Sequence, residues 1–177
     1  KYVALDCEMV GVGSTPDADS VLARVSVVNY HGTILYDTYV LPSDGVKVTD
    51  YRTAISGIQP EHLKPKRTES LVNLKNQPLA SLYSVQSTLD ALLKDRILIG
   101  HALKNDLSAL LLSHPHALIR DTSRYAPFRA LAGGRTPSLR KLAKQVLGRE
   151  IQTGEHSSVE DAQAAMDLFK HVRGEWE

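Results

Sequence analysis

The sequence has only one cysteine and no long apolar run, and each of these shortages excludes a class of protein or site. One cysteine, Cys7, rules out an internal disulfide and a zinc site built from cysteines. No apolar run approaches the roughly 20 residues that a membrane-spanning helix requires, so we expect no membrane partner. Lys1 opens directly into a strand-like segment without a charged and then apolar leader. We therefore expect a trimmed domain, whose residues do not themselves indicate a compartment.

Aromatic residues are scarce, and acids are absent from one long segment. At 6% of the chain, the aromatic residues form no run that resembles a stacking platform for bases. The formal net charge is only +1, yet residues 122–149 contain no acid and seven basic residues: Arg124, Arg129, Arg135, Arg140, Lys141, Lys144 and Arg149. A solvated helix face would explain any one of these side chains. The positive field of the whole segment favours contact with the phosphates of a polyanion.

A length of 177 residues, 42% of them hydrophobic, fits one globular domain over residues 1–177. Runs rich in β-branched residues, with turn residues between them at 11–20 and 31–33, predict three antiparallel strands over residues 1–10, 21–30 and 33–42. Further on, the apolar spacing predicts helices at 84–95, 105–114, 138–148 and 157–176 and strands at 96–102 and 118–125. Lys64–Leu82 lacks a clear period and is expected to be a surface loop. The predicted fold class is α/β and ribonuclease H-like, with a mixed five-stranded sheet of three antiparallel strands and parallel additions, flanked by helices.

Two acids interrupt the apolar first strand, in the stretch ALDCEMVG. Residues two apart in a strand face the same way, so Asp6 and Glu8 project together, while Cys7 points to the opposite face as a core residue. Neighbouring carboxylates repel and are costly to bury, so something positive should compensate them. Magnesium and manganese prefer oxygen ligands, which makes the pair the beginning of a metal site. The alternative to a metal site is that both acids lie at a solvent-exposed end of the strand.

Three more polar residues occupy positions that suit the same site. Asp106 follows a buried strand at the start of a helix, where a carboxylate also interacts well with the helix N-terminus. Asp161 lies one turn inside the last helix, which Ser157 or Ser158 can cap, and His156 precedes that cap in a loop. Each has an ordinary structural explanation by itself. Together, four carboxylates can hold two divalent ions about 3.5 to 4 Å apart, and a histidine can accept the proton of an attacking water.

The sequence resembles the 3′–5′ exonucleases named for their Asp-Glu-Asp-Asp acids, in the branch that carries a histidine (DEDDh). The resemblance lies in seven segments, which occur in the family's order: ALDCEMVGVG, LARVSVVN, VTDYRTAISGI, ILIGHALKNDLSAL, IRDT, SLRKLA and EHSSVEDAQAAM. It implies that His156 is the general base. It also implies that two Mg²⁺ or Mn²⁺ ions are bound by four acids: Asp6, Glu8, Asp106 and Asp161.

The resemblance also implies how the substrate is held and used. Met9 would pack against the terminal nucleotide and Arg52 would lie near its ribose, although Met9 also fits a core position and Arg52 a structural one. The implied reaction is the metal-dependent release of nucleoside 5′-monophosphates from the 3′ end of single-stranded RNA by a monomer. The implied setting is ribosomal RNA processing on pre-ribosomal particles in the nucleus, within the nucleolus.

Two other functions remain open at this point. One is a nuclease of the same fold with another task, either an endonuclease or a DNA-directed, proofreading-type exonuclease. The other is a catalytically silent module that docks on RNA or ribonucleoprotein through residues 122–149. A competent residue at every expected catalytic position favours the enzyme. The segment Lys64–Leu82 is longer than expected in the family and leaves substrate specificity open.

Overall fold

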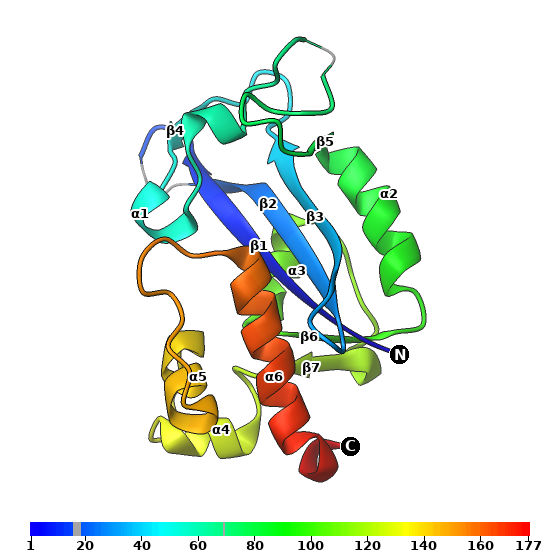
Figure 1. Ribbon diagram of the computed structural model, residues 1–177, viewed down its shortest axis with the longest axis vertical. Coiled ribbons are helices and arrows are strands. Elements are labelled where there is room, and N and C mark those ends of the chain that lie inside the picture. Colours follow the sequence, from blue (N-terminus) through cyan, green and yellow to red (C-terminus); the bar gives the residue numbers. More distant parts are fainter. Residues whose placement is uncertain (16–18, 69) are drawn as a thin grey trace.

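A mixed β-sheet forms the centre of a computed structural model that describes residues 1–15, 19–68 and 70–177 (Figure 1). The strands of these residues are β1 (Tyr2–Val12), β2 (Asp19–Asn29), β3 (Ile34–Leu41), β4 (Val48–Asp50), β5 (Leu79–Ser81), β6 (Ile97–Gly100) and β7 (Ile119–Asp121). Their order across the sheet is β5-β3-β2-β1-β6-β7, and β4 pairs with β1 outside this row. β1, β2 and β3 are antiparallel, β6 runs parallel to β1, and β7 runs parallel to β6.

The predicted α/β fold class and its five strands are confirmed, but the sheet has two further strands within the described ranges. β4 and β5 have three residues each, which is too short to show an alternating pattern in the sequence. β5 also corrects the loop expected over Lys64–Leu82, because it pairs with β3 at the end of that segment. Residues 16–18 of the predicted turn and residue 69 of the predicted loop lie outside the described residues.

Helices cover both faces of the sheet (Figure 1). Their bounds are α1 (Thr53–Ser56), α2 (Leu82–Leu93), α3 (Leu103–Ala109), α4 (Ala126–Leu131), α5 (Leu139–Leu147) and α6 (Ser158–Trp176), with 3₁₀ turns η1 (Pro60–His62) and η2 (His116–Leu118). α6 packs on β1, β2 and β6, and α5 packs on α6. The opposite face buries α2 and α3 against alternate residues of the same strands.

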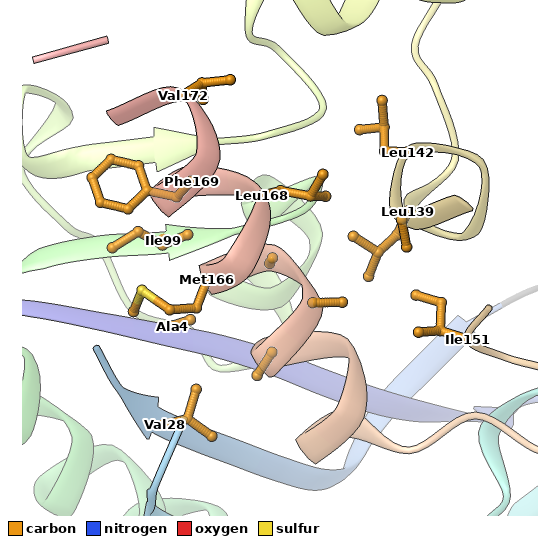
Figure 2. Close-up of a cluster of buried hydrophobic side chains, with 14 of the residues drawn as sticks. Ala4, Val28, Ile99, Leu139, Leu142, Ile151, Met166, Leu168, Phe169 and Val172 are labelled. Carbon is orange, nitrogen blue, oxygen red and sulfur yellow. The ribbon is translucent and has the colours of Figure 1, made fainter. Parts of the chain in front are cut away.

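The alternation along β1 decides which side chains meet α6. Ala4 belongs to the apolar cluster of α6, where it lies beside Met166 (Figure 2), whereas Val3 and Leu5 belong to the cluster of α2 and α3. Since the side-chain period of a strand is two, the residues that follow Ala4 on the same face are Asp6 and Glu8. The packing of α6 therefore brings its N-terminal end to the two acids of β1.

The four predicted helices are present, with differences at their ends. α3 ends at Ala109, because Leu111 adopts a left-handed backbone conformation (φ 52°) that a helix cannot continue. α1 and α4 were not predicted, since four and six residues show no helical period. Among the residues that the structure describes, no helix has the length and apolar composition needed to span a membrane.

Candidate active site

Three of the predicted site residues meet directly. Glu8, His156 and Asp161 each offer a ligand atom, and these atoms lie within 4.8 Å of one another. Glu8 comes from β1, Asp161 from the first turn of α6, and His156 from the loop before α6. Because the β1–β2 pairing shifts register between Glu8 and Met9, a local irregularity in the strand lies beside the Glu8 side chain.

Asp106 and Asp6 complete the acidic cluster. The Asp106 carboxylate lies in the first turn of α3, where its Oδ1 accepts a hydrogen bond from the backbone N–H of Cys7 at 3.0 Å. Cys7 itself is buried in the apolar cluster on the other face, as predicted. The charges of Asp106, Asp161 and Glu8 all act on Asp6. The structure therefore brings together the four predicted acids and His156.

The cluster is electrostatically costly for a protein without cations. Glu8 is 7% exposed, and Asp106 and Asp161 are each 4% exposed. Burial and the charge of Asp161 raise the pKa of Glu8 to about 8, and burial raises the pKa of Asp106 to about 7. Burial also raises the pKa of Asp161, and burial together with the neighbouring acids raises the pKa of Asp6 well above its ordinary value. In the folded chain these carboxyl groups therefore ionise less readily than ordinary Asp and Glu side chains.

Two oxygens in the cluster are unsatisfied. Glu8 Oε1 and Asp161 Oδ1 are buried and have no hydrogen-bond partner among the described residues. An ionised carboxylate oxygen without a partner in a buried site costs several kcal/mol. A divalent cation with a preference for oxygen ligands would satisfy both atoms, so the residues present fit Mg²⁺ or Mn²⁺.

Arg24 supplies part of the positive charge expected near Glu8. It is the register partner of Glu8 on β2, and its charge opposes the rise in the pKa of that carboxyl. Its guanidinium also binds both oxygens of Asp37 on β3, at 2.9 Å each. Asp37 in turn accepts a hydrogen bond from Ser26, whose hydroxyl lies 2.6 Å from that of Ser158 at the start of α6. This network joins β2, β3 and α6 beside the acids.

His156 is held in place mainly through its backbone. Its N–H donates to the carbonyl of Ile55 in α1 at 2.8 Å, and the segment before α6 passes beside α1 (Figure 1). Gly57 follows α1 with a φ of 67°, and a Cβ atom there would lie 2.9 Å from the His156 carbonyl oxygen. The side chain is only 28% exposed, with Nδ1 3.8 Å from Asp161 Oδ2, which is beyond a hydrogen bond. The imidazole is thus close to the acids without being bound to Asp161.

The predicted serine caps of α6 differ from the structure. Ser157 is the N-cap residue by position, but its hydroxyl makes no capping hydrogen bond, and its carbonyl accepts the N–H of Asp161 at 2.9 Å. The Ser158 hydroxyl is instead committed to Ser26. A buried hydroxyl partner on β2 therefore replaces the local cap that the sequence suggests.

Met9 and Arg52 both make contacts within the protein. Met9 is partly buried and packs against the apolar cluster of α2 and α3. Arg52 precedes α1 in a left-handed conformation (φ 50°), and its Nη1 donates to Ser20 Oγ at 2.9 Å. Their predicted contacts with a nucleotide stay predictions.

Gln152 is a positioning residue that the sequence did not reveal. It lies in the segment between α5 and α6, with a φ of 53°, and its Nε2 donates to Asp161 Oδ2 at 2.7 Å. This contact engages one carboxylate oxygen and leaves Oδ1 as the unsatisfied one. A glutamine in an irregular segment belongs to no period or motif, so no signal in the sequence marked it.

Asp121 is a second positioning residue, at the end of β7 within the quoted segment IRDT. Its carboxylate accepts the N–H groups of Ala102 at 2.9 Å and Leu103 at 3.1 Å, at the N-terminus of α3. Ala102 has a φ of 60°, so these bonds hold an uncommon backbone conformation at the start of the helix that carries Asp106. The sequence revealed no role for Asp121, although its position at the end of a strand is a signal that could have marked it.

Comparison with known proteins places the chain among nucleases. It matches the exonuclease family model RNase_T over residues 3–169. It is 50% identical to RNA exonuclease 4 of Aspergillus fumigatus over 177 residues, which are 100% of this chain and 52% of that protein. It is 51% identical to RNA exonuclease 4 of Saccharomyces cerevisiae, over 100% of this chain and 56% of that protein. It is 49% identical to RNA exonuclease 4 of Homo sapiens, over 100% of this chain and 38% of that protein. The chain spans about half the length of the curated relatives it matches.

Solved structures agree with the fold. The Neurospora crassa Pan2 catalytic unit, with protease and nuclease domains, aligns with a TM-score of 0.81 at 28% identity, over 98% of this chain and 27% of that one. The Saccharomyces cerevisiae Pan2 module of pseudoubiquitin hydrolase and RNA exonuclease, in complex with AAUUAA RNA, aligns with a TM-score of 0.80 at 31% identity, over 98% and 28%. Because the family model covers nearly all of the sequence and the relatives are about half identical along it, the chain belongs to the exonuclease family.

Proposed function

We propose that the chain is a metal-dependent 3′–5′ exoribonuclease, which removes nucleoside 5′-monophosphates one at a time from the 3′ end of single-stranded RNA. The observation that carries this proposal is the pair of orphaned buried oxygens, Glu8 Oε1 and Asp161 Oδ1, in a cluster of four carboxylates. Relatives named RNA exonuclease 4 and a Pan2 module solved with RNA support RNA as the substrate.

The proposed mechanism uses two bound Mg²⁺ or Mn²⁺ ions, which would supply the Lewis acidity that activates a water and neutralises the phosphodiester. The ions would be held by the four acids: Asp6, Glu8, Asp106 and Asp161. The imidazole of His156 accepts the proton of the attacking water as the new P–O bond forms. The P–O3′ bond to the preceding nucleotide breaks, and the departing O3′ takes a proton from solvent.

Substrate recognition in this proposal concerns the terminal nucleotide. Met9 follows Glu8 on β1 and would pack against this nucleotide, while Arg52 would lie near its ribose, whose 2′-hydroxyl distinguishes RNA from DNA. Met9 belongs to β1, which carries Glu8, and Arg52 directly precedes α1, which holds the backbone of His156.

The proposed biological role is ribosomal RNA processing on pre-ribosomal particles in the nucleolus, with the chain acting as a monomer. The support is the family resemblance and the names of the relatives. Localisation of the tagged full-length protein, together with the ribosomal RNA precursors that accumulate after its depletion, tests this role. A protein absent from the nucleolus with unchanged precursors would contradict it.

The first experiment follows the degradation of 5′-labelled single-stranded RNA and of DNA of the same sequence, with Mg²⁺, Mn²⁺ or a chelator, beside an RNA blocked by a 3′-phosphate. We expect a metal-dependent ladder that shortens from the free 3′ end and forms faster on RNA. Asp6→Asn should abolish trimming while the protein stays folded, because it removes a ligand charge and also relieves repulsion.

Each alternative function gives a different result in the same assay. Cutting of the blocked RNA or of a circular RNA indicates an endonuclease, and faster trimming of DNA indicates a DNA-directed enzyme. RNA binding without any trimming indicates a docking module. Substantial activity in Asp6→Asn would remove the two-metal mechanism.

A further inference from the structure

The acid-free segment found in the sequence forms an exposed surface on α4, the loop after it and the start of α5. We propose that this basic surface, made by Arg129, Arg135, Arg140 and Lys141, binds phosphates of the RNA substrate upstream of its 3′-terminal nucleotide. All four residues are exposed. The proposal rests on the proposed function, and it assigns a second contact region for the same substrate.

Among the described residues, two cations of this segment have carboxylate partners, and the four of the basic surface do not. Lys144 pairs with Glu150 at 2.8 Å, and Arg149 pairs with Asp167 at 3.3 Å. Within the part of the chain that the structure describes, the four cations of the basic surface have no carboxylate within ion-pair distance. Their charges are therefore available to an external anion.

Arg129 and Arg140 each have one weaker internal contact. The Arg129 guanidinium donates to the carbonyl of Gly134 at 2.8 Å, which keeps it beside the loop after α4. The charge of Arg140 contributes, after that of Lys144, to lowering the pKa of Glu150. Glu150 already has Lys144 as its ion-pair partner, so the surface keeps an excess of positive charge.

The position of two of these cations is unfavourable for the helix that carries them. Arg140 and Lys141 lie in the first turn of α5, which has no acid, although the partial positive charge of a helix N-terminus favours acids there. Ser138 offsets part of this cost, since its hydroxyl accepts the N–H of Lys141 at 3.3 Å. A helix that places cations against its own dipole departs from a local stability rule, and such departures are expected at functional sites.

Both ends of α5 are tied to the elements that carry the acids. Before α5, the carbonyl of Pro137 lies 3.0 Å from Nε2 of His101, in the segment that leads to α3 and Asp106. After α5, Gln152 binds Asp161. The segments on either side of α5 therefore connect the basic surface to the elements that carry the acids.

Substrates of different length distinguish the contribution of the basic surface from that of the catalytic centre. A dinucleotide has only one phosphodiester, the one that is cleaved, so it has no upstream phosphate to place on α5. Longer RNA has such phosphates, and each contact with a single strand adds about 0.7 to the slope of log affinity against log salt concentration. The basic surface should thus affect long substrates and not the dinucleotide.

The test compares the wild type with the triple variant Arg135→Gln, Arg140→Gln, Lys141→Gln. For a long single-stranded RNA we expect KM to rise about tenfold with unchanged kcat, and the salt slope to fall by up to about 2. Hydrolysis of a dinucleotide should be unchanged. The matched control is Lys64→Gln, Lys66→Gln, Arg67→Gln, which removes the same charge from exposed residues of the loop before β5, distant from α5 in Figure 1. We expect the control to match the wild type.

Direct binding keeps this test independent of nuclease activity. Fluorescence anisotropy with labelled RNA in chelator should show weaker binding by the triple variant than by the wild type and the control, even if no protein cleaves RNA. If the wild type binds RNA but does not cleave it, the proposed function is overturned and the basic surface is not. Equal RNA affinity and salt slope in the triple variant and the wild type, or an equal loss in the control, would overturn the basic surface.

Discussion

At the scale of single residues, the two oxygens of Asp161 have different surroundings. Gln152 donates to Oδ2, while Oδ1 is buried without a partner. A hydrogen bond of 2.7 Å fixes the rotation of the carboxylate, so the free oxygen faces one direction. Such outer contacts orient ligands and raise the affinity of metal sites.

Gln152→Ala should weaken metal binding about 10- to 100-fold, because Asp161 loses the donor that orients it. Titration calorimetry with Mn²⁺ measures the affinity, and kcat should fall with it. Gln145→Ala, which removes an exposed glutamine from α5, is the matched control. Unchanged Mn²⁺ affinity in Gln152→Ala would show that the contact has no positioning role.

At the scale of elements, the short helix α1 is the support of the His156 loop. The carbonyl of Ile55 binds the N–H of His156, and Gly57 lets the two segments approach closely. The position of His156 therefore depends on an element that contributes no predicted catalytic side chain.

Gly57→Ala should lower kcat by up to about 100-fold, because a Cβ atom 2.9 Å from the His156 carbonyl oxygen forces the loop to move. Steady-state kinetics and thermal unfolding measure the two consequences. Gly45→Ala is the control, since Gly45 has a similar left-handed conformation (φ 81°) but nothing within 4 Å. If both variants lost only stability and kept kcat, α1 would not position His156.

The long elements and the acids could be predicted from the sequence because their signals are local. β1 and α6 have enough residues to show their periods, and Asp6 and Glu8 stand out as charges in an apolar strand. Gln152 acts through a contact that depends on how the α5–α6 segment packs, which no local pattern encodes. β4 and β5 exist because neighbouring strands offer free edges, so three residues suffice there.

At the scale of the whole molecule, the cluster makes the metal-free fold sensitive to pH. β1, α3 and α6 each bring a carboxylate whose pKa is raised, including Glu8 to about 8 and Asp106 to about 7. The native state then binds more protons than the unfolded state above the ordinary carboxyl pKa. Stability is therefore present at low pH and is lost as the pH rises through these raised values.

In chelator, the free energy of unfolding should fall between about pH 6.5 and pH 8, by about 1.4 kcal/mol per pH unit for each excess proton bound. Burial lowers the pKa values of His62 and His101, so these two residues make stability rise with pH below about pH 6.5. Above that pH they no longer oppose the fall in stability. Urea unfolding at several pH values measures it, and Glu8→Gln should flatten the slope. Stability that rises with pH in the metal-free wild type would contradict the raised pKa values.

The acids of β1 precede Asp161 of α6 by about 150 residues in the sequence. A ribosome that adds about 5 to 20 residues per second completes these two parts of the site about 8 to 30 seconds apart. During that interval β1 can pair with β2 and β3, but the fourth carboxylate and the histidine do not yet exist. The candidate site is therefore complete only when α6 docks on a sheet that is already formed, and no earlier segment of the sequence carries all of its residues.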